Sequence, residues 1–276
     1  MAEISAAAVK SLRERTNLPM MDCKKALQES GGDVDKAVEL LRKAGAKLME
    51  KRSGRATSSG RIATFFAPNG KLATMIDLRC ESAPVAANEH FIQLANDLAQ
   101  QLAVGPGAAS PEALLLQPSP SKTAPTLKQQ FDDLNNKIRE VFKVERIVRV
   151  DGQCGGYVHH NGATGVLLRF EGGNAELARD ICMHVAAMRP AVVNKEELDP
   201  AVVAKEREIL SEAARKEGKP EKIIDKMVEG RLRNFYAECC LAEQPFVKDD
   251  KQTVGQVAKA AGMKLVSFIR WELPKE

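Results

Sequence analysis

The same arrangement occurs twice in this sequence: two short runs of alternating hydrophobic residues joined by an Asn-Gly turn, followed by an amphipathic helix. The turns are Asn69-Gly70 and Asn161-Gly162. The flanking runs are residues 62–67, 72–78, 157–158 and 166–170. Asn-Gly between such runs favours a β-hairpin, because both residues tolerate the positive φ angles of a tight turn. The repeat predicts an α+β fold with two related antiparallel subdomains, each a β-hairpin plus a helix.

The two copies differ in the length of chain between the hairpin and its helix. We predict these helices over residues 85–104 and 175–188. Gly70 lies 24 positions before Leu94, whereas Gly162 lies 15 positions before the corresponding Leu177. The first copy therefore has nine additional residues, which we place within residues 79–93. Loops on a rigid scaffold often carry function, although a neutral difference in loop length explains the same observation.

The N-terminal residues 1–53 are predicted to form a separate module of three short helices. Ser5 and Asp33 occupy N-cap positions, Leu18-Pro19 interrupts the first helical pattern, and Gly31-Gly32 ends the second. Gly45 is expected to end the third helix. Residues 47–61 are basic and rich in Ser and Gly, so we interpret them as a linker reaching to about residue 60. A solvated tether is favoured over an arm that contacts RNA.

The rest of the chain divides into core subdomains over residues 61–150 and 151–276. Five prolines within residues 105–125 indicate a surface connection in the first of these. In the second, Asp199-Pro200 predicts the start of a helical hairpin at about residues 199–237, interrupted at Gly218. This hairpin is expected to protrude or to pack against a partner, and packing inside the core is an equal alternative. A short helix over residues 253–261 and a strand over 265–273 follow.

Composition argues against several classes of protein. The net charge of +4 is well below the dense Lys/Arg excess of dedicated nucleic-acid binders, so no direct nucleic-acid partner is expected. The six cysteines are dispersed without a CxxC pair, which favours reduced thiols in the cytosol over a zinc site or disulfide framework. No apolar run approaches the roughly 20 residues of a membrane span. We expect a cytoplasmic protein with no membrane partner.

The residues suited to catalysis are few and badly placed. Cys154 and His159 are expected at opposite ends of one strand, too far apart for direct contact. His159 and His160, as neighbours in a strand, are expected to point to opposite faces, which disfavours a shared metal ion. The glycines of residues 152–165 are followed by no Gly-Lys-Ser/Thr, so a phosphate loop is not indicated. We predict a binding protein, not an enzyme, with no catalytic residue, no metal site and no cofactor.

Several motifs spread along the chain resemble one family, translation elongation factor Ts. The N-terminal part of the resemblance is carried by Leu12-Arg13-Glu14-Arg15-Thr16 and Met20-Met21-Asp22-Cys23-Lys24-Lys25. Further motifs are His184-Val185-Ala186-Ala187-Met188, Val228-Glu229-Gly230-Arg231-Leu232, Glu243-Gln244-Pro245-Phe246-Val247 and Phe268-Ile269-Arg270. The resemblance covers nearly the whole chain. It implies a guanine nucleotide exchange factor that binds elongation factor Tu carrying GDP, displaces Mg²⁺ and GDP, and is released by GTP.

The resemblance also implies contact residues. The apolar turn of the N-terminal module in this family docks on the G domain of elongation factor Tu, which corresponds here to Leu12, Met20 and Met21. Methionine suits such a contact because its flexible, polarisable side chain fits irregular apolar surfaces, although core methionines explain the residues alone. The contact histidine of the family corresponds to His159, by the pattern Tyr157-x-His159 ahead of Gly162.

The chain departs from the family pattern in the longer loop of the first repeat. The family commonly has Cys-Glu-Thr-Asp-Phe-Val-Ala, whereas this chain has Cys80-Glu81-Ser82-Ala83-Pro84-Val85-Ala86. The Asp and Phe associated with dislocation of Mg²⁺ are therefore replaced by Ala83 and Pro84. We expect Ser82 as an N-cap and Pro84 at the helix start to stiffen this loop, which comprises Ser82, Ala83, Pro84 and Val85.

Two other readings compete with the exchange factor. One is a ubiquitin-associated-like (UBA-like) binding module joined to an unrelated α+β body, since small three-helix bundles bind many partners. The other is a ribosome or RNA accessory protein that uses the basic linker. For the exchange factor, the expected partner is elongation factor Tu, both GDP-bound and nucleotide-free, and a homodimer or two-to-two complex is possible.

Overall fold

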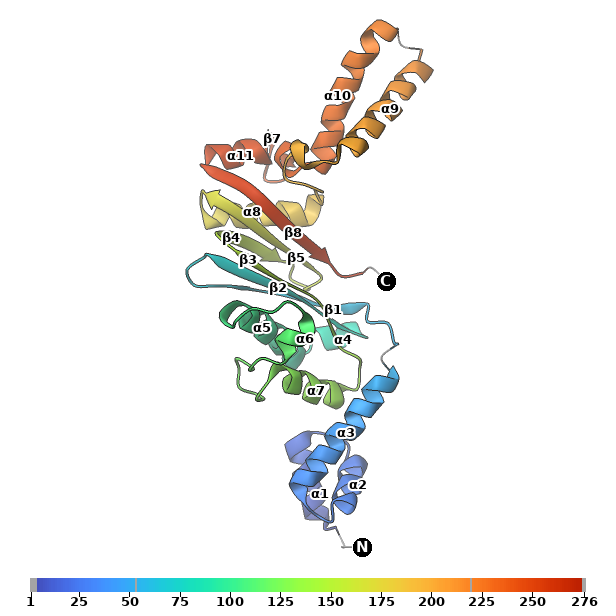
Figure 1. Cartoon of the computed structure of the whole chain (residues 1–276), viewed down its shortest axis with the longest axis vertical. Coiled ribbons are helices and arrows are strands. Elements are labelled where there is room, and N and C mark those ends of the chain that lie inside the picture. The colour runs from blue at the N-terminus through green and yellow to red at the C-terminus, as the bar shows by residue number, and fades with distance from the viewer. Residues whose placement is uncertain (1–3, 53, 219, 275–276) are drawn as a thin grey trace.

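The computed structural model describes residues 4–52, 54–218 and 220–274. The molecule is elongated, with an N-terminal bundle of helices at one end, two β-sheets in the middle and a helical hairpin at the other end (Figure 1). The predicted α+β class is confirmed: helices come first, and antiparallel sheets with helices packed on them follow.

The N-terminal bundle consists of α1 (Ala6–Thr16), α2 (Met20–Glu29) and α3 (Val34–Arg52). Ser5 caps α1, as expected, by accepting a hydrogen bond from the backbone N–H of Ala8. The apolar side chains at helical spacing close a small core between the helices. Its buried members are Val9, Leu12, Cys23, Ala26, Leu27, Ala37 and Leu41.

The expectation that Gly45 ends the third helix is wrong, because α3 continues to Arg52. Gly45 instead allows a close approach: a Cβ atom at this position would collide with the side chain of Asn136 in α7 (Leu127–Ile138). The first part of the predicted linker is therefore helical. Arg52 also donates a 2.6 Å hydrogen bond to the backbone carbonyl of Arg139, so this basic residue is used within the chain.

The first sheet has the order β1-β2-β3 and contains the first predicted hairpin. Its strands are β1 (Ser59–Phe66), β2 (Leu72–Cys80) and β3 (Lys143–Asp151). The helix expected over residues 85–104 is in fact two, α4 (Ala83–Ala86) and α5 (Glu89–Val104), because the Asn88 side chain caps a new helix by accepting from His90 N–H. The expected surface connection also contains α6 (Pro111–Leu115), whose Leu114 is buried. Neither helix α7 nor strand β3 was predicted from the sequence.

The second sheet has the order β4-β5-β8. Its strands are β4 (Cys154–Val158), β5 (Thr164–Gly172) and β8 (Met263–Glu272), and α8 (Ala175–Met188) covers one face. The second hairpin, its helix and the last strand are thus confirmed. The short β6 (Pro245–Phe246) and β7 (Asp249–Thr253) pair with each other, and Thr253 caps α11 (Val254–Ala260).

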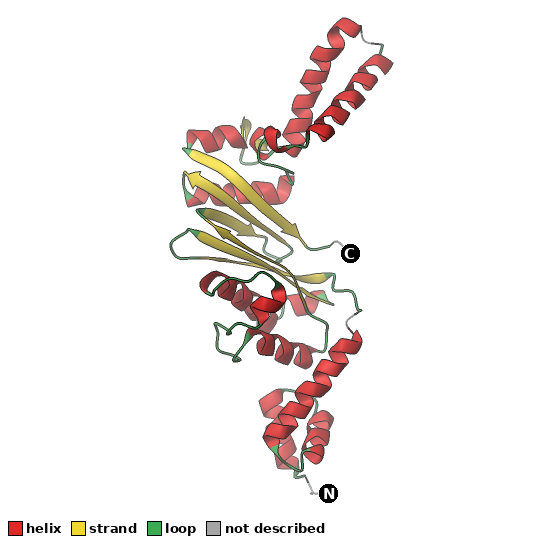
Figure 2. Cartoon of the chain, viewed as in Figure 1, coloured by secondary structure: helices red, strands yellow, loops and turns green. Residues whose placement is uncertain are grey.

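The two sheets pack against each other, and the helices cover their outer faces (Figure 2). Apolar side chains from both sheets form the layer between them, with Ile62 and Met75 from the first sheet and Leu167 and Ile269 from the second. Helix α5 packs on β1 and β2, and α8 packs on β4 and β5. The two sheets therefore hold the hairpin turns of both repeats in a fixed relation.

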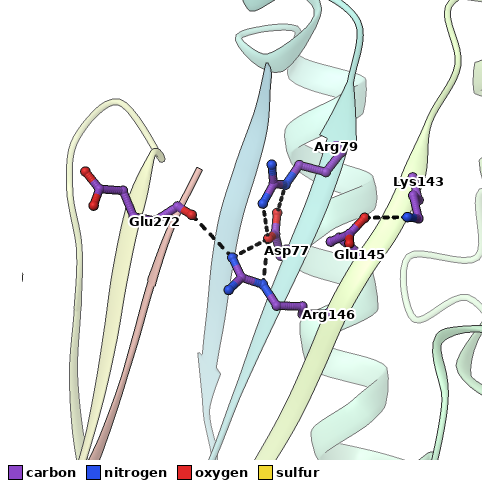
Figure 3. Close-up of polar contacts among 6 residues, drawn as sticks. All are labelled: Asp77, Arg79, Lys143, Glu145, Arg146 and Glu272. Atoms are coloured by element: carbon purple, nitrogen blue, oxygen red, sulfur yellow. Dashed lines mark hydrogen bonds and ion pairs between the residues drawn. The ribbon is translucent and has the colours of Figure 1, made fainter. Parts of the chain in front are cut away.

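A buried ionic cluster lies at one end of this inter-sheet layer (Figure 3). The carboxylate of Asp77, which is fully buried, accepts hydrogen bonds from Arg79 at 2.5 and 2.8 Å and from Arg146 at 2.6 and 2.9 Å. The Arg146 guanidinium also lies 4.7 Å from the centre of the Trp271 ring and donates to the backbone carbonyl of Glu272 at 3.4 Å. The cluster links β2 and β3 of the first sheet to β8 of the second.

The hairpin of α9 (Pro200–Lys216) and α10 (Glu221–Cys239) extends away from the sheets (Figure 1). Asp199 caps α9 by accepting from Ala201 N–H, and Pro200 occupies the first turn, as predicted. The two helices pack through Ala214, Ile224, Val228 and Leu232, while Ile223 is exposed. Lys219 lies outside the described residues.

One buried histidine makes the fold sensitive to acid. His184 of α8 accepts from the backbone N–H of Val247 at Nδ1 and lies 2.9 Å from Gln244 Oε1 at Nε2, an arrangement that requires the neutral ring. Burial lowers the pKa of His184 below its ordinary 6.5, and the hydrogen bond to Gln244 offsets only part of this. Because the unfolded chain takes up the proton more readily, this contribution to stability is intact above about pH 6.5 and is lost as the pH falls.

We expect the His184→Gln variant to be less stable than the parent at pH 7, and to lose less stability than the parent between pH 7 and pH 5. In the parent, His184 can lower the free energy of unfolding by at most about 1.4 kcal/mol for each pH unit of acidification. Urea unfolding at the two pH values measures both quantities. An equal acid-induced loss in the variant and the parent would contradict this role for His184, and His90→Gln, at an exposed position on α5, is the matched control.

Candidate partner-binding site

The two methionines at the start of α2 form an exposed apolar turn. Pro19 precedes the helix in an extended conformation, and Cys23, Ala26 and Leu27 bury the opposite face of α2 in the bundle. Met20 and Met21 are consequently left outside, 52% and 61% exposed. They are not core methionines, and a flexible apolar pair in this position can serve as a contact for an irregular apolar surface.

Leu12 does not belong to that surface. Its side chain is 1% exposed and packs in the core of the N-terminal bundle. The expectation that Leu12 contacts a partner directly is therefore corrected. The physical reason is that Leu12 faces the other helices, together with Val9 and Leu27, in the core of the bundle.

The N-terminal bundle is held on α7 by polar contacts. Arg42 of α3 forms an ion pair with Asp133 at 3.1 Å, and Asp22 of α2 forms one with Arg139, the C-cap residue of α7. These side chains are about 43–45% exposed. Ion pairs of this kind contribute little individually and weaken with salt. They nevertheless define where the Met20-Met21 turn lies relative to the sheets.

The loop after β2 is fixed by two carboxylates. Glu81 accepts from the backbone N–H of Val141 at 2.8 Å and pairs with Arg55 at 3.1 Å. Glu140 accepts from both the hydroxyl and the backbone N–H of Ser82, at 2.6 and 3.0 Å. The Ser82 side chain is therefore engaged with Glu140 and makes no hydrogen bond that caps α4. The expected capping by this hydroxyl is wrong, although Ser82 does occupy the N-cap position.

The extra residues of the first repeat build α4 and one additional turn of α5. The connection between β2 and α5 spans residues 81–88, whereas residues 173–174 suffice between β5 and α8. Pro84 is in the first turn of α4, as expected. Ala83 and Pro84 are exposed, while Val85 is half-buried and packs on the core of the first sheet. The loop thus exposes two residues with short side chains, one of them a proline, to solvent.

His159 lies just beyond the end of β4, at the start of the second hairpin turn. Its Nδ1 is 2.8 Å from the hydroxyl of Tyr157, and its backbone N–H donates to Thr164. The rings of His159 and His160 are 4.2 Å apart, so the expectation that they point to opposite faces is wrong. The strand has ended before them, and the alternation of a strand no longer applies. Within the described ranges, no group of three potential ligand residues is arranged for a metal ion.

An open groove lies between the extra loop of the first repeat and the hairpin turn of the second, and His159 itself is outside its lining. Helix α4 lies on one side of it and the β4–β5 turn on the other, so that Ala83, Ala86 and Ala87 share the groove with His160 and Asn161. Arg61, Thr164 and the C-terminal end of β8 complete the lining. The groove has a volume of about 640 Å³. Ala83 and His160, which are 77 positions apart in the sequence, therefore belong to one surface, which the separate motifs did not predict.

The thiol of Cys80, at the end of β2, is unsuited to nucleophilic chemistry. Burial, together with the charge of Glu140, raises the pKa of Cys80 to about 12, and the thiol donates to the backbone carbonyl of Ser82. At neutral pH this residue is a protonated thiol that packs in the core and fixes the loop. The geometry offers a rigid contact surface at this point.

Comparison with known proteins shows the family of the chain. A family model described as Elongation factor TS matches residues 81–275. Elongation factor Ts of Thioalkalivibrio sulfidiphilus is 40% identical over 273 residues, which cover 98% of this chain and 92% of that protein. Elongation factor Ts of Saccharopolyspora erythraea is 42% identical over 278 residues, 99% of each chain. The chain belongs to the elongation factor Ts family.

Elongation factor Ts proteins are nucleotide exchange factors for elongation factor Tu in translation elongation, and they are not enzymes. The predicted family and function are therefore confirmed. A UBA-like module on an unrelated body is excluded, because the elongation factor Ts match itself covers the body. In the part of the chain that the structure describes, no helix has both the length and the apolar character required to cross a bilayer.

Sequence reasoning missed Glu81 and Glu140 as anchors of the loop and Arg61 as part of the groove. Glu140 lies in a stretch without strong periodicity, and only its distance from Ser82 reveals its role. Arg61 appeared as one of several basic linker residues. No pattern in the sequence separates it from Arg55, which pairs with Glu81.

Proposed function

We propose that this elongation factor Ts protein holds elongation factor Tu through Met20 and Met21, and loosens the bound Mg²⁺ and GDP with the α4 loop and His159. The observation that carries the proposal is the groove that unites α4 with the β4–β5 turn. An exposed apolar turn at one end of the molecule and an open groove in its middle can contact two areas of one partner. The first contact provides affinity, and the second acts on the nucleotide site.

Exchange requires a difference in affinity between two states of the partner. A factor promotes GDP release by binding nucleotide-free elongation factor Tu more tightly than the GDP-bound form, and GTP binding then releases the factor by the same coupling. In this chain the difference would come from the backbone of Ser82, Ala83, Pro84 and Val85. The carboxylates of Glu81 and Glu140 hold this loop in place, so the loop keeps its shape when the partner's nucleotide site moves.

The loop and His159 are tested by release of labelled GDP from purified elongation factor Tu. The intact protein should accelerate release, and no acceleration would contradict the proposed function. The His159→Ala variant should reduce the acceleration about 10-fold, a size typical of a well-placed contact. The double substitution Ala83→Asp and Pro84→Phe should also change the rate, since it adds a charge and an aromatic ring to a rigid surface. His90→Ala, at an exposed residue of α5 outside the groove lining, is the control.

If neither the double variant nor His159→Ala alters the rate while the parent protein remains active, the α4 loop and this histidine are not the means of nucleotide release. Circular dichroism and thermal unfolding of each variant establish that it is folded. In that case the protein would still be an exchange factor, but residues elsewhere on its surface would cause nucleotide release.

The proposal also includes an interpretation of three parts of the fold. The three N-terminal helices are interpreted as a UBA-like module, the two hairpin-plus-helix units as copies of one ancestral unit, and the helical hairpin of α9 and α10 as a further partner contact. A homodimer or a two-to-two complex with elongation factor Tu and a cytoplasmic location remain predictions. Direct RNA binding is disfavoured, because Arg52 and Arg55 are engaged within the chain.

A further inference from the structure

Arg61 is placed at the junction of the two repeats. It belongs to β1, next to Ile62, whose backbone N–H donates to the carbonyl of Gly162 at 2.8 Å. The Arg61 side chain lies directly over Gly162, where a Cβ atom would come within 2.7 Å of Cγ and 3.2 Å of Nη1 of the arginine. Gly162, with φ of 73°, therefore provides both the turn and the space for the arginine.

The charge of Arg61 has no counterpart within the chain. Over the described ranges 4–52, 54–218 and 220–274, its side chain forms no hydrogen bond, ion pair or ring contact. The nearby arginines differ: Arg55 pairs with Glu81, and Arg79 with Asp77. Arg61 as a whole residue is half-buried, and a guanidinium that loses hydration without gaining a partner is less stable than a paired one. An arginine in this state is expected to pair with an anionic group of another molecule.

The lining of the groove around Arg61 favours the binding of an anionic group. Of the described residues that line it, Glu272 is the sole carboxylate, and it already pairs with Arg189 at 2.6 Å and Arg270 at 2.9 Å. The other side of the groove is formed by the small side chains of Ala83, Ala86 and Ala87, which leave the guanidinium accessible. A carboxylate that entered here could accept two parallel hydrogen bonds from Arg61.

We infer that Arg61 is a partner-contact residue that binds a carboxylate side chain of elongation factor Tu when the α4 groove docks. The inference rests on the proposed function. A carboxylate of the protein is favoured over a phosphate of GDP for a thermodynamic reason. A contact with the nucleotide's phosphate would stabilise the GDP-bound complex and oppose release, whereas a contact with a carboxylate of the protein persists after the nucleotide leaves and favours exchange to the extent that it is stronger in the nucleotide-free complex.

The test compares Arg61→Met, which keeps a long apolar stem without the charge, and Arg61→Lys, which keeps the charge without the planar fork. Calorimetric titration measures the Kd of each for nucleotide-free and for GDP-bound elongation factor Tu, at 50 and 200 mM salt. We expect Arg61→Met to weaken binding to nucleotide-free elongation factor Tu about 10-fold or more, and Arg61→Lys to fall between it and the parent. The Kd of Arg61→Met should also depend less on salt than that of the parent.

Arg179→Met is the matched control, because Arg179 is an exposed arginine of α8 outside the groove lining, and it should leave the Kd unchanged. A Kd of Arg61→Met within about 2-fold of the parent for nucleotide-free elongation factor Tu would overturn the inference. Weakening confined to the GDP-bound form would overturn it in favour of a phosphate contact. If Arg61→Met fails to fold in thermal unfolding, Arg61→Lys decides, and a parent-like Kd then overturns the inference. Failure of the parent protein to accelerate GDP release would instead overturn the proposed function.

Discussion

Replacing Asp77 with Ala is expected to reduce the free energy of unfolding by about 3–5 kcal/mol, the largest effect on stability that we predict. The carboxylate is fully buried and neutralises Arg79, which is itself almost completely buried. Without it, a guanidinium would remain in the inter-sheet layer with no anion to offset its desolvation. Arg146 would also lose the contact that orients it over Trp271. Urea unfolding followed by circular dichroism measures the change.

A matched control separates burial from the loss of an ion pair as such. Asp132 pairs with Lys128 on the surface of α7, with 44% of its side chain exposed. The Asp132→Ala variant should lose no more than about 0.5 kcal/mol, as is usual for an exposed pair one helical turn apart. A similar small loss in Asp77→Ala would show that the buried cluster is not needed to hold the sheets together.

Substituting both Met20 and Met21 with Ser should weaken binding to elongation factor Tu by about 30-fold or more. Each methionine presents an apolar side chain that is more than half exposed in the free protein, and burying such a side chain at an interface contributes about 1–2 kcal/mol. Serine removes the apolar area while leaving the core of Cys23, Ala26 and Leu27 intact. Titration calorimetry with the GDP-bound and nucleotide-free partner gives the affinities.

The thermal midpoint of the double variant should match that of the parent, since neither methionine is part of the core. Met188, which is 48% exposed at the end of α8, offers a control on the same kind of side chain. Met188→Ser should bind elongation factor Tu as the parent does. Equal affinities for the parent and the Met20/Met21 double variant would show that the apolar turn is not the anchor.

Local signals in the sequence account for the elements that were predicted correctly. Asn69-Gly70 and Asn161-Gly162 identified both hairpins, and Asp199-Pro200 identified the start of α9. The errors arose where tertiary contacts outweighed a local signal. Glycine commonly ends helices, but α3 continues past Gly45. The missing side chain of Gly45 serves instead to let α7 pack closely against α3. Strand β3 has the adjacent apolar residues Ile147 and Val148 and pairs with β2 through a register shift between Asp77 and Leu78, so its sequence lacks a clear alternation.

The site was predictable only in pieces. The prediction that Met20 and Met21 are contact residues came from the family resemblance, and their exposure required the structure to establish it. The burial of Leu12 likewise depends on the packing of all three N-terminal helices. The sequence indicated Ser82 as a cap but gave no sign that Glu140, 58 positions away, binds its hydroxyl. Proximity between α4 and the β4–β5 turn depends on how the two sheets stack, which periodicity does not encode.

The strand order of the second sheet has a consequence for synthesis on the ribosome. The first sheet needs nothing beyond Asp151, so its strands can pair soon after that residue leaves the exit tunnel. In the second sheet, β5 must wait for β8, which begins only at Met263, after the whole helical hairpin has been made. During that interval β5 has an unpaired edge. The nascent chain therefore passes through a half-folded stage in which one sheet is complete and the other remains open to non-native pairing.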